Sequence, residues 1–320
     1  MIVCLVTPAP PGSRKGNRIT ALRWARLLRE LGHRVRLTQQ YRGQRSDLLV
    51  ALHARRSAES VRRFRAEHPG KPLIVALTGT DLYHDIHHDP AAQASLALAD
   101  RLIVLQPEGV RALPEPLRAK AVVIHQSAVA PARRPPPRDD VFEVCVLGHL
   151  RPVKDPFRAA EAARLLPTSS RVRIVQVGAA LSDEMARHAR AEAARNPRYV
   201  WLGELPRTAA LRVLGRCRLL VLTSLMEGGA NVISEALAVG TPVISSRIAG
   251  SIGLLGPDYP GYFPVGDTPA LAELLHRAET DPVFYGELTA WCARLRGLAD
   301  PARERQAWAE LLGQLAGSAG

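Results

Sequence analysis

The sequence of 320 residues predicts an α/β protein built from two doubly wound domains. Short apolar segments typical of buried strands alternate with amphipathic helical segments, which favours parallel sheets covered by helices on both faces. A single proline- and arginine-rich segment, PARRPPPRDD (131–140), interrupts this alternation near the middle of the chain. Each half is long enough to bury a core of its own. We therefore expect two Rossmann-like domains that face a central cleft.

The first domain is predicted over residues 1–130. Its expected strands are Ile2–Thr7, Arg34–Gln39, Leu48–Leu52, Leu73–Leu77, Arg101–Leu105 and Ala121–Ile124. A strongly amphipathic helix over Ile19–Leu31, ended by Gly32, joins the first two. Ligands of such sheets bind outside the carboxyl ends of the strands. The loops that follow the strands are therefore the first places to look for a site.

The second domain is predicted over residues 141–300, after a linker at 131–140 whose prolines cannot pair inside a sheet. Helices are expected at Glu184–Arg195 and Ala209–Leu214, and from about Thr268 onward. Residues 301–320 are expected to form a C-terminal helix that packs back on the first domain. The expected strands are Glu143–Leu147, Arg171–Val177, Tyr199–Leu202, Leu219–Thr223 and Pro242–Ser245.

Composition narrows the class of protein. The net charge is +13, which favours anionic partners, but the basic residues are spread along the chain and aromatic residues make up only 5%. Small anionic substrates therefore fit better than nucleic acid. No apolar run is long enough to span a bilayer. The pattern at the N-terminus predicts a β-strand and not a signal peptide, so we expect a cytoplasmic protein. The widely spaced cysteines indicate buried thiols; they are Cys4, Cys145, Cys217 and Cys292.

The segment LMEGGANVISEALAVGTPVISSR (225–247) carries the strongest signal. Glu227 and Glu235 are separated by seven residues, with a Gly-Gly turn and the start of a helix between them. Free backbone N–H groups and the positive end of a helix dipole form a natural seat for phosphate. Glu235, about one turn inside the helix, is placed to bind sugar hydroxyls. A pair of solvated helix carboxylates is the simpler alternative, but the flanking turn favours a nucleotide-sugar site.

This spacing, in the second of two such domains, resembles the retaining GT-B glycosyltransferases of the family-4 type. GHLRPVKDP (148–156) resembles their G-R-L-x-x-x-K-G segment, whose cations hold the donor diphosphate. Lys154 matches the family lysine, whereas His149 stands where arginine is usual, which leaves Arg151 or His149 as the second contact. An ordinary surface lysine, or a core histidine, is the structural alternative.

The resemblance implies catalytic roles for Glu227, Lys154 and Arg151, and a donor that is a UDP-sugar bound without a metal or a tightly bound cofactor. Glu235 is expected to bind the ribose, and Glu227 the donor sugar. WLGELP (201–206) resembles the segment that lies near the nucleotide base. The other expected donor-binding residues are Gly148, His149, Leu202, Gly203, Gly228, Gly229, Ala230 and Asn231.

A narrower resemblance runs over the full length. PAPPGSRKGNRITALRWARLLRELGHRV (8–35), ALTGTDLYHDI (76–86) and GHLRPVKDP resemble the selenosugar synthases of selenoneine biosynthesis. Those enzymes are understood to join selenium from selenophosphate to the anomeric carbon of a sugar from UDP-N-acetylglucosamine or a relative. The resemblance implies the same reaction here, with release of UDP, and leaves room for a downstream pathway enzyme as a partner.

The cationic loop Pro10–Arg18 follows the first strand and opens a helix, so it is the expected entry for a small anionic acceptor. Helix capping and a solvated charged face are the simpler explanations. Further acceptor-side candidates lie at later strand ends. Together the candidates are Arg14, Lys15, Gly16, Asn17, Arg18, Thr20, Thr80, Asp81, His84 and Gln106.

The segment DLYHDIHHD (81–89) also invites a metal site, because Asp81, His84, Asp85 and His88 would share one face of a helix. No distant ligand has the expected spacing, so we expect no metal there. Two other functions stay open: a glycosyltransferase with a saccharide or lipid hydroxyl acceptor, and a nucleotide-sugar-binding or RNA-binding protein without turnover. The sequence does not decide the sugar, the anomeric outcome, the preference for selenium over sulfur, the oligomeric state, or the roles of His84, His87 and His88.

Overall fold

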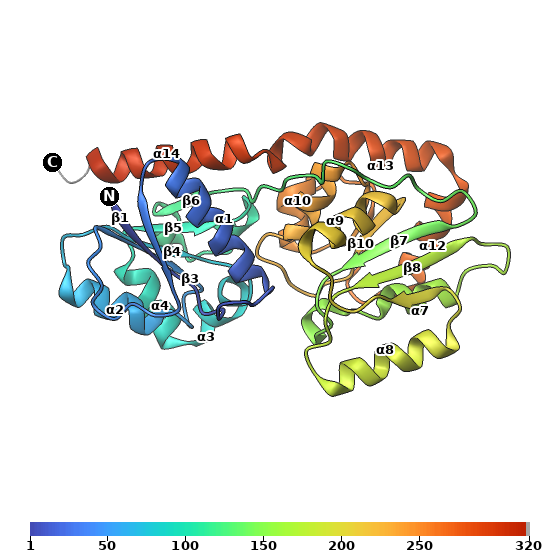
Figure 1. The fold of residues 1–320 in the computed structure, drawn as a ribbon, viewed down its shortest axis with the longest axis horizontal. Coiled ribbons are helices and arrows are strands. Elements are labelled where there is room, and N and C mark those ends of the chain that lie inside the picture. Colours follow the sequence, from blue (N-terminus) through green and yellow to red (C-terminus); the bar gives the residue numbers. More distant parts are fainter. Residues whose placement is uncertain (318–320) are drawn as a thin grey trace. The chain divides into compact units, whose positions relative to one another are not determined.

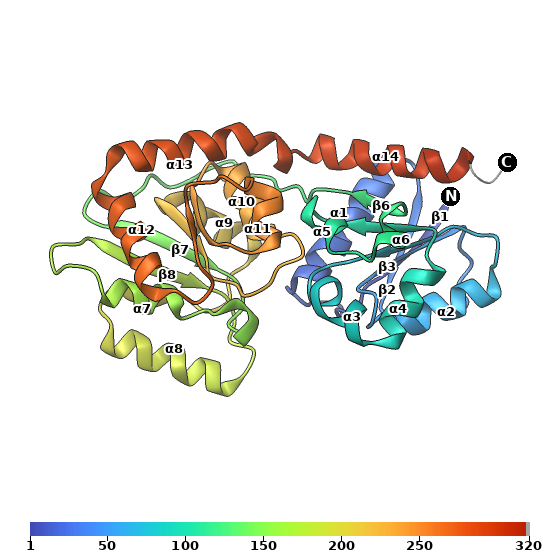
Figure 2. The same cartoon turned by 180° about the vertical axis from the view of Figure 1, so that it is seen from behind.

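The computed structural model describes residues 1–317 and confirms two α/β units with parallel sheets (Figures 1 and 2). The first unit comprises Met1–Gln126, the loop Glu227–Gly229 and the chain from Pro301. The second comprises Ser127–Met226 and Ala230–Asp300. Residues 131–140, which were predicted to be a linker, carry no helix or strand.

Within the described residues, the first sheet has six parallel strands in the order β2-β1-β3-β4-β5-β6. The predicted strands of this unit are correct to within one residue at each end. The strands are β1 (Ile2–Val6), β2 (Arg34–Thr38), β3 (Leu48–Leu52), β4 (Leu73–Ala76), β5 (Arg101–Val104) and β6 (Ala121–Val123).

Alternating side chains of these strands point to opposite faces and meet different helices. Val3 and Leu5 pack with α1 (Gly16–Glu30) and α14 (Pro301–Gly317). Cys4 and Val6 pack on the other face, with α2 (Ala58–Glu67) and α4 (Pro90–Leu98). Figure 1 shows the two pairs of helices on opposite sides of the sheet. The remaining short helices of this unit are α3 (Ile86–His88), α5 (Glu108–Arg111) and α6 (Glu115–Arg118).

Helix α1 begins three residues earlier than predicted, because Lys15 is extended and Gly16 is already helical. Gly16, Asn17 and Arg18 are therefore the first turn of the helix and not part of the preceding loop. This change matters for the site, since the N–H groups of a first helical turn point out of the helix end.

Helix α14 is held to α1 by a buried polar network. The Arg23 guanidinium lies 3.0 Å from Glu304 Oε2, and the Trp24 indole donates to Glu304 Oε1 at 2.7 Å. The ring of Trp24 also meets Trp308 edge-on, with centroids 5.0 Å apart. Glu304 is 2% exposed, so this network shields a buried ion pair between two helices distant in sequence.

The second sheet, counted over the described residues, also has six parallel strands, in the order β12-β11-β10-β7-β8-β9. Five were predicted to within one residue, but β12 was missed because it has only two residues. The strands are β7 (Phe142–Leu147), β8 (Val172–Val177), β9 (Tyr199–Trp201), β10 (Leu219–Leu222), β11 (Val243–Ser246) and β12 (Tyr262–Phe263). The helices are α7 (Arg158–Arg164), α8 (Asp183–Arg195), α9 (Arg207–Arg216), α10 (Asn231–Val239), α11 (Ala249–Leu255), α12 (Thr268–Thr280) and α13 (Pro282–Leu295).

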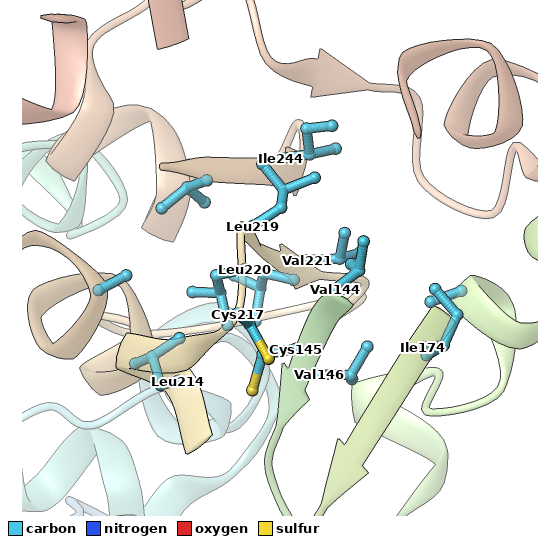
Figure 3. Close-up of a cluster of buried hydrophobic side chains, with 14 of the residues drawn as sticks. Val144, Cys145, Val146, Ile174, Leu214, Cys217, Leu219, Leu220, Val221 and Ile244 are labelled. Carbon is cyan, nitrogen blue, oxygen red and sulfur yellow. The ribbon is translucent and has the colours of Figure 1, made fainter. Parts of the chain in front are cut away.

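The cysteines are all free and buried, as predicted. Cys145 on β7 and Cys217 beside β10 lie close together in the core of the second unit, among aliphatic side chains (Figure 3). A hydrogen bond with Cys217, together with burial, raises the pKa of the Cys145 thiol well above its ordinary value. These thiols therefore act as small apolar core residues and not as nucleophiles.

Over residues 1–317, the structure contains no helix with the length and apolar character that crossing a membrane requires.

Candidate functional site

The second sheet has its topological switch point between β7 and β10, where the strand order reverses. Open parallel sheets bind ligands in the crevice outside the carboxyl ends of the strands at this point. A pocket lies there, formed by the ends of β7, β8 and β10 and by the turn that carries Lys154. Its lining residues are Val146, Leu147, Gly148, His149, Lys154, Pro156, Gln176, Val221, Leu222, Thr223 and Ser224.

Two loops approach each other closely where Gly148 and His149 line this pocket. Gly178, which follows β8, has a φ of +153°, and a Cβ placed on it would lie 2.0 Å from Gly148 O. Only glycine is compatible with this approach. The Ala179 N–H donates to His149 Nδ1 at 3.2 Å. The neutral His149 ring must then carry its proton on Nε2, which makes Nε2 a hydrogen-bond donor.

Lys154 is the last residue of a 3-10 turn, Pro152–Lys154. The turn is fixed to the end of β10, because the Thr223 hydroxyl donates to Lys154 O and Asp155 O at 2.9 Å each. Asp155 ends the turn in the left-handed conformation, with a φ of 42°. These bonds place the half-buried Lys154 in the pocket, whereas Arg151 is exposed at the start of the turn. Of the two predicted cations, Lys154 is the one that lines the pocket.

Glu235 lies on α10, which begins at Asn231 directly after the predicted Gly-Gly turn. Its side chain is 9% exposed and pairs with Arg207, whose Nη2 lies 2.9 Å from Glu235 Oε1. The helix ends at Gly240, whose φ of 76° suits the predicted Ala-Val-Gly-Thr-Pro break. The simpler alternative, a solvated helix carboxylate, is therefore wrong for Glu235.

The loop Glu227–Gly229 precedes α10 and groups with the first unit. Gly228 is buried, and its carbonyl accepts a hydrogen bond from Gln106 Nε2 at 3.1 Å. A Cβ on Gly228 would come within 2.5 Å of the Thr78 carbonyl carbon, so glycine is required there. Glu227 itself is half-buried. The remaining predicted donor residues, Ala230 and Asn231, are the N-cap and the first residue of α10.

The segment after β9 carries Leu202 and Gly203. The side chain of Leu202 is 39% exposed, and Gly203 has a φ of +66°. The Gly203 carbonyl accepts a hydrogen bond from Gly178 N at 2.8 Å, which ties this segment to the glycine loop of the pocket. An exposed apolar side chain such as that of Leu202 is suited to a flat apolar surface such as a nucleotide base.

In the first unit, the N-terminal turn of α1 has no side-chain cap. Arg14, Lys15 and Gly16 are exposed there. The Nε atom of Arg18 is buried and, among the described residues, has no hydrogen-bond partner. A buried cationic donor next to an uncapped positive helix end is suited to an anion.

Several predicted acceptor-side residues are buried and hydrogen-bonded within the first unit. The Thr20 hydroxyl accepts a hydrogen bond from Gln126, and Gln106 binds Tyr83 and Gly109 besides Gly228. Both side chains are buried.

Asp81 is another of these, because it is fully buried and accepts hydrogen bonds from the N–H groups of Ala54, Thr78 and Gly79. The three side chains are thus buried and hydrogen-bonded within the first unit, and their contact with an acceptor stays a prediction.

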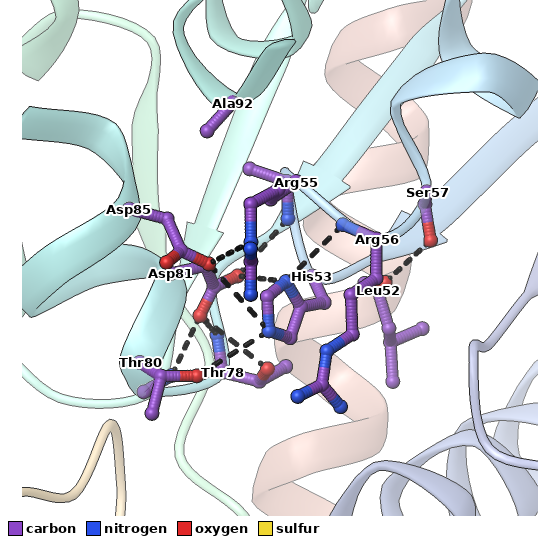
Figure 4. A network of polar contacts seen from close by, with 12 residues as sticks. Leu52, His53, Arg55, Arg56, Ser57, Thr78, Thr80, Asp81, Asp85 and Ala92 are labelled. Atoms are coloured by element: carbon purple, nitrogen blue, oxygen red, sulfur yellow. Dashed lines mark hydrogen bonds and ion pairs between the residues drawn. The ribbon is translucent and has the colours of Figure 1, made fainter. Parts of the chain in front are cut away.

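His53 was missed by the sequence analysis. It follows β3, has a φ of 73°, and lies buried beside Asp81, Asp85 and Thr80 (Figure 4). Its Nδ1 accepts from the Arg56 N–H at 3.5 Å, so Nε2 carries the proton of the neutral ring and donates to Thr80 Oγ1 at 3.3 Å. A histidine directly after the buried strand LLVAL was the signal that could have revealed it.

Burial holds the pKa of His53 below its ordinary value, although both neighbouring carboxylates lie 3.9 Å away and oppose this. The ring is therefore neutral at pH 7. The Nε2–H group donates a hydrogen bond to the oxygen of the exposed Thr80 hydroxyl. The proton of that hydroxyl is therefore directed away from His53, toward other groups.

The predicted shared helix face of Asp81, His84, Asp85 and His88 is wrong. Asp81–Asp85 is π-helical and leads into the short α3, which changes the spacing of the side chains. The side chain of Asp85 is 7% exposed, whereas that of His84 is 67% exposed, so the first is buried and the second faces solvent. Within the part of the chain that the structure describes, no group of histidine, cysteine and acidic side chains is arranged to hold a metal ion.

Comparison with known proteins agrees with this geometry. The model of the family described as glycosyl transferases group 1 matches residues 132–292, which is half of the chain. The chain therefore belongs to this family of glycosyltransferases. A search of curated protein sequences found no significant match.

Solved structures of similar fold cover nearly the whole chain. The structure of HepE from Anabaena, in complex with UDP and glucose, is 18% identical, covers 98% of this chain and 100% of its own, and has a TM-score of 0.74. Sucrose-phosphate synthase from Thermosynechococcus elongatus is 15% identical, covers 99% of each chain, and has a TM-score of 0.76. These similarities show that the fold is the GT-B fold.

Proposed function

We propose that this glycosyltransferase uses a UDP-sugar as its donor and binds it in the pocket of the second unit. The observation that carries this proposal is the position of the pocket, at the switch point of the sheet, with Lys154 and His149 in its lining. Support comes from HepE, which has a similar fold and was solved with UDP and with UDP-glucose. The donor's diphosphate binds Lys154 and the His149 Nε2–H, with Arg151 at the edge. The uridine lies against Leu202 and Gly203.

Glu235 accepts hydrogen bonds from the ribose hydroxyls, and Glu227 contacts the sugar that is transferred. As the glycosidic bond breaks, negative charge builds on the β-phosphate. The Lys154 ammonium and the N–H groups at the start of α10 stabilise this charge more in the transition state than in the ground state. Because Thr223 fixes the turn of Lys154 in advance, little reorganisation is needed during the reaction.

The proposed acceptor is selenophosphate, a small anion. The full-length resemblance to selenosugar synthases supports this choice, and so does the chemistry of the first turn of α1. Its uncapped N–H groups and the buried Nε of Arg18 form a donor set for the oxygens of a phosphate-like group. The Thr80 hydroxyl, oriented by His53, adds a further hydrogen-bond donor on the acceptor side.

In the proposed step a carbon–selenium bond forms at the anomeric carbon while the bond from that carbon to the β-phosphate oxygen breaks and UDP leaves. The selenium keeps its phosphoryl group in this step, so the immediate product is a sugar selenophosphate, and water releases the phosphate from selenium afterwards. The selenium nucleophile is anionic near neutral pH, so the reaction does not require a strong general base. The protein contributes positioning and charge stabilisation. A front-face displacement with retention of configuration is expected from the family resemblance.

The test is an incubation of the purified protein with UDP-N-acetylglucosamine and freshly prepared selenophosphate, in which UDP release and product mass are measured together. We expect a selenosugar mass that requires both substrates and that forms much more slowly in Lys154→Ala. UDP release without this mass, restored by a sugar or lipid alcohol, would replace selenophosphate with a hydroxyl acceptor. Absence of UDP release with every donor and acceptor would contradict the proposed donor as well.

A further inference from the structure

The ion pair between Arg207 and Glu235 stands out because only one of its members is expected from the family motif. Glu235 belongs to the Glu-x7-Glu motif, whereas Arg207 lies outside every segment that resembles the family. Arg207 is the first residue of α9 and follows Pro206, which caps that helix. The fold brings this helix start beside α10, so that Arg207 Nη2 reaches Glu235 Oε1 at 2.9 Å.

This pair differs from an ordinary surface salt bridge. Exposed pairs contribute little because water solvates both partners. Here the carboxylate is 9% exposed and the guanidinium 39% exposed, so the acidic partner is buried and the basic one reaches in from the surface. A buried ionised carboxylate needs a hydrogen-bonded counter-charge. Arg207 supplies it from the solvent side of the carboxylate.

The stereochemistry of the pair then decides where the carboxylate points. A carboxylate has two oxygens that together accept about four hydrogen bonds. A guanidinium is planar and rigid, so a contact at Oε1 restricts rotation about the last side-chain bond of Glu235. The acceptor capacity of the carboxylate is thereby held in one orientation before the donor arrives, which lowers the ordering cost of binding.

We infer that Arg207 is a positioning residue for the donor's ribose: it keeps Glu235 ionised and oriented so that the carboxylate accepts hydrogen bonds from the ribose hydroxyls. This inference rests on the proposed function, and it adds a residue that determines selectivity for a ribonucleotide. Arg207 acts through Glu235, so its removal weakens binding of UDP without weakening that of an analogue that lacks the ribose hydroxyls.

The experiment compares the dissociation constants of UDP and 2′,3′-dideoxyuridine diphosphate by calorimetry in five proteins: the unmodified chain, Glu235→Gln, Arg207→Gln, Arg207→Lys and Arg212→Gln. Arg212 lies exposed on the same helix and serves as the matched control. We expect the unmodified chain and Arg212→Gln to prefer UDP by about tenfold or more, as for a hydrogen bond to a charged group. Both Glu235→Gln and Arg207→Gln should lose most of this preference, and Arg207→Lys should recover part of it.

The outcomes separate this inference from the proposed function. Preference for UDP that persists in Arg207→Gln but is lost in Glu235→Gln would overturn the role of Arg207 and leave the donor site in place. Equal weakening of both ligands in Arg207→Gln would assign Arg207 to the diphosphate instead. No binding of UDP by the unmodified chain would overturn the donor proposal itself. Thermal unfolding of each variant distinguishes these results from misfolding.

Discussion

Substitution of Gly178 by alanine tests whether the loop that carries this glycine shapes the proposed donor pocket. A Cβ at this position would lie 2.0 Å from Gly148 O, 2.4 Å from Gly148 C and 2.9 Å from His149 N. All three are backbone atoms, so no side chain can rotate to make room. Carbon and oxygen in van der Waals contact are separated by more than about 3 Å. The Gly148–His149 loop must therefore move by roughly 1 Å, or the Gly178 backbone must leave its φ of +153°.

A displacement of this size is large for a catalytic site. Misplacement of a reacting group by about 1 Å costs on the order of 10²-fold in rate, and Gly148 and His149 both line the pocket. We therefore expect Gly178→Ala to lower kcat/KM for acceptor-dependent UDP release by about 10²-fold. The unfolding temperature should also fall, because the added methyl group strains the backbone. The assays are steady-state UDP release and calorimetric unfolding.

Gly286→Ala is the matched control, because Gly286 lies inside α13 and a Cβ there would meet nothing within 4 Å. Alanine favours a helix over glycine by about 1 kcal/mol, so this variant should be as active and at least as stable as the unmodified chain. Activity of Gly178→Ala equal to that of the control would show that the two loops can separate at no cost to the pocket, which would refute this reasoning.

Three further substitutions test other parts of the account. Glu304→Ala removes the counter-charge of the buried Arg23 and should lower the free energy of unfolding by about 3–5 kcal/mol in urea titrations, whereas the exposed Glu310→Ala should change it by less than about 0.5 kcal/mol. His53→Gln should make the free energy of unfolding less dependent on pH. Because the pKa of His53 is lowered in the folded chain, the unfolded chain takes up the proton first as pH falls through about 6.5. The unmodified chain therefore loses stability on acidification, and the variant loses less. A variant with the same slope between pH 7.5 and 5.5 would contradict the buried neutral ring. Lys154→Ala should lower kcat, measured as UDP release, by on the order of 10²-fold. A decrease of less than about threefold would show that Lys154 does not stabilise the transition state.

Strands could be predicted almost completely because the sequence pattern and the structure respond to the same property. A strand buried on both faces of a parallel sheet must be a continuous apolar run, and LLVAL at β3 is an example. Strand β12 was missed because two residues, Tyr262–Phe263, give no such run. The early start of α1 was missed because Gly16 reads as a loop residue, although its place in the helix follows from the extended Lys15 before it.

Site residues that belong to a local sequence motif could be predicted, whereas those defined by contacts between distant segments could not. Glu235 and Lys154 follow from local motifs, and the structure places them at a buried helix position and in a pocket lining. Arg207 depends on a contact between segments distant in sequence, which cannot be derived from spacing along the chain. The place of His53 after a buried strand is visible in the sequence, but its contacts with Thr80, Asp81 and Asp85 are not. Asp81 is a further case: its position near a strand end predicts a ligand contact, but nothing in the sequence indicates that its carboxylate accepts hydrogen bonds from three backbone N–H groups.

The most direct test of the central claim is a calorimetric titration of the unmodified chain with UDP, repeated on Lys154→Ala. The account places the diphosphate beside Lys154 in the pocket at the carboxyl ends of β7 and β10. It predicts saturable binding at one site, weakened about tenfold or more when the charged hydrogen bond is lost. Absence of binding at millimolar UDP, or equal affinity in both proteins, would contradict it.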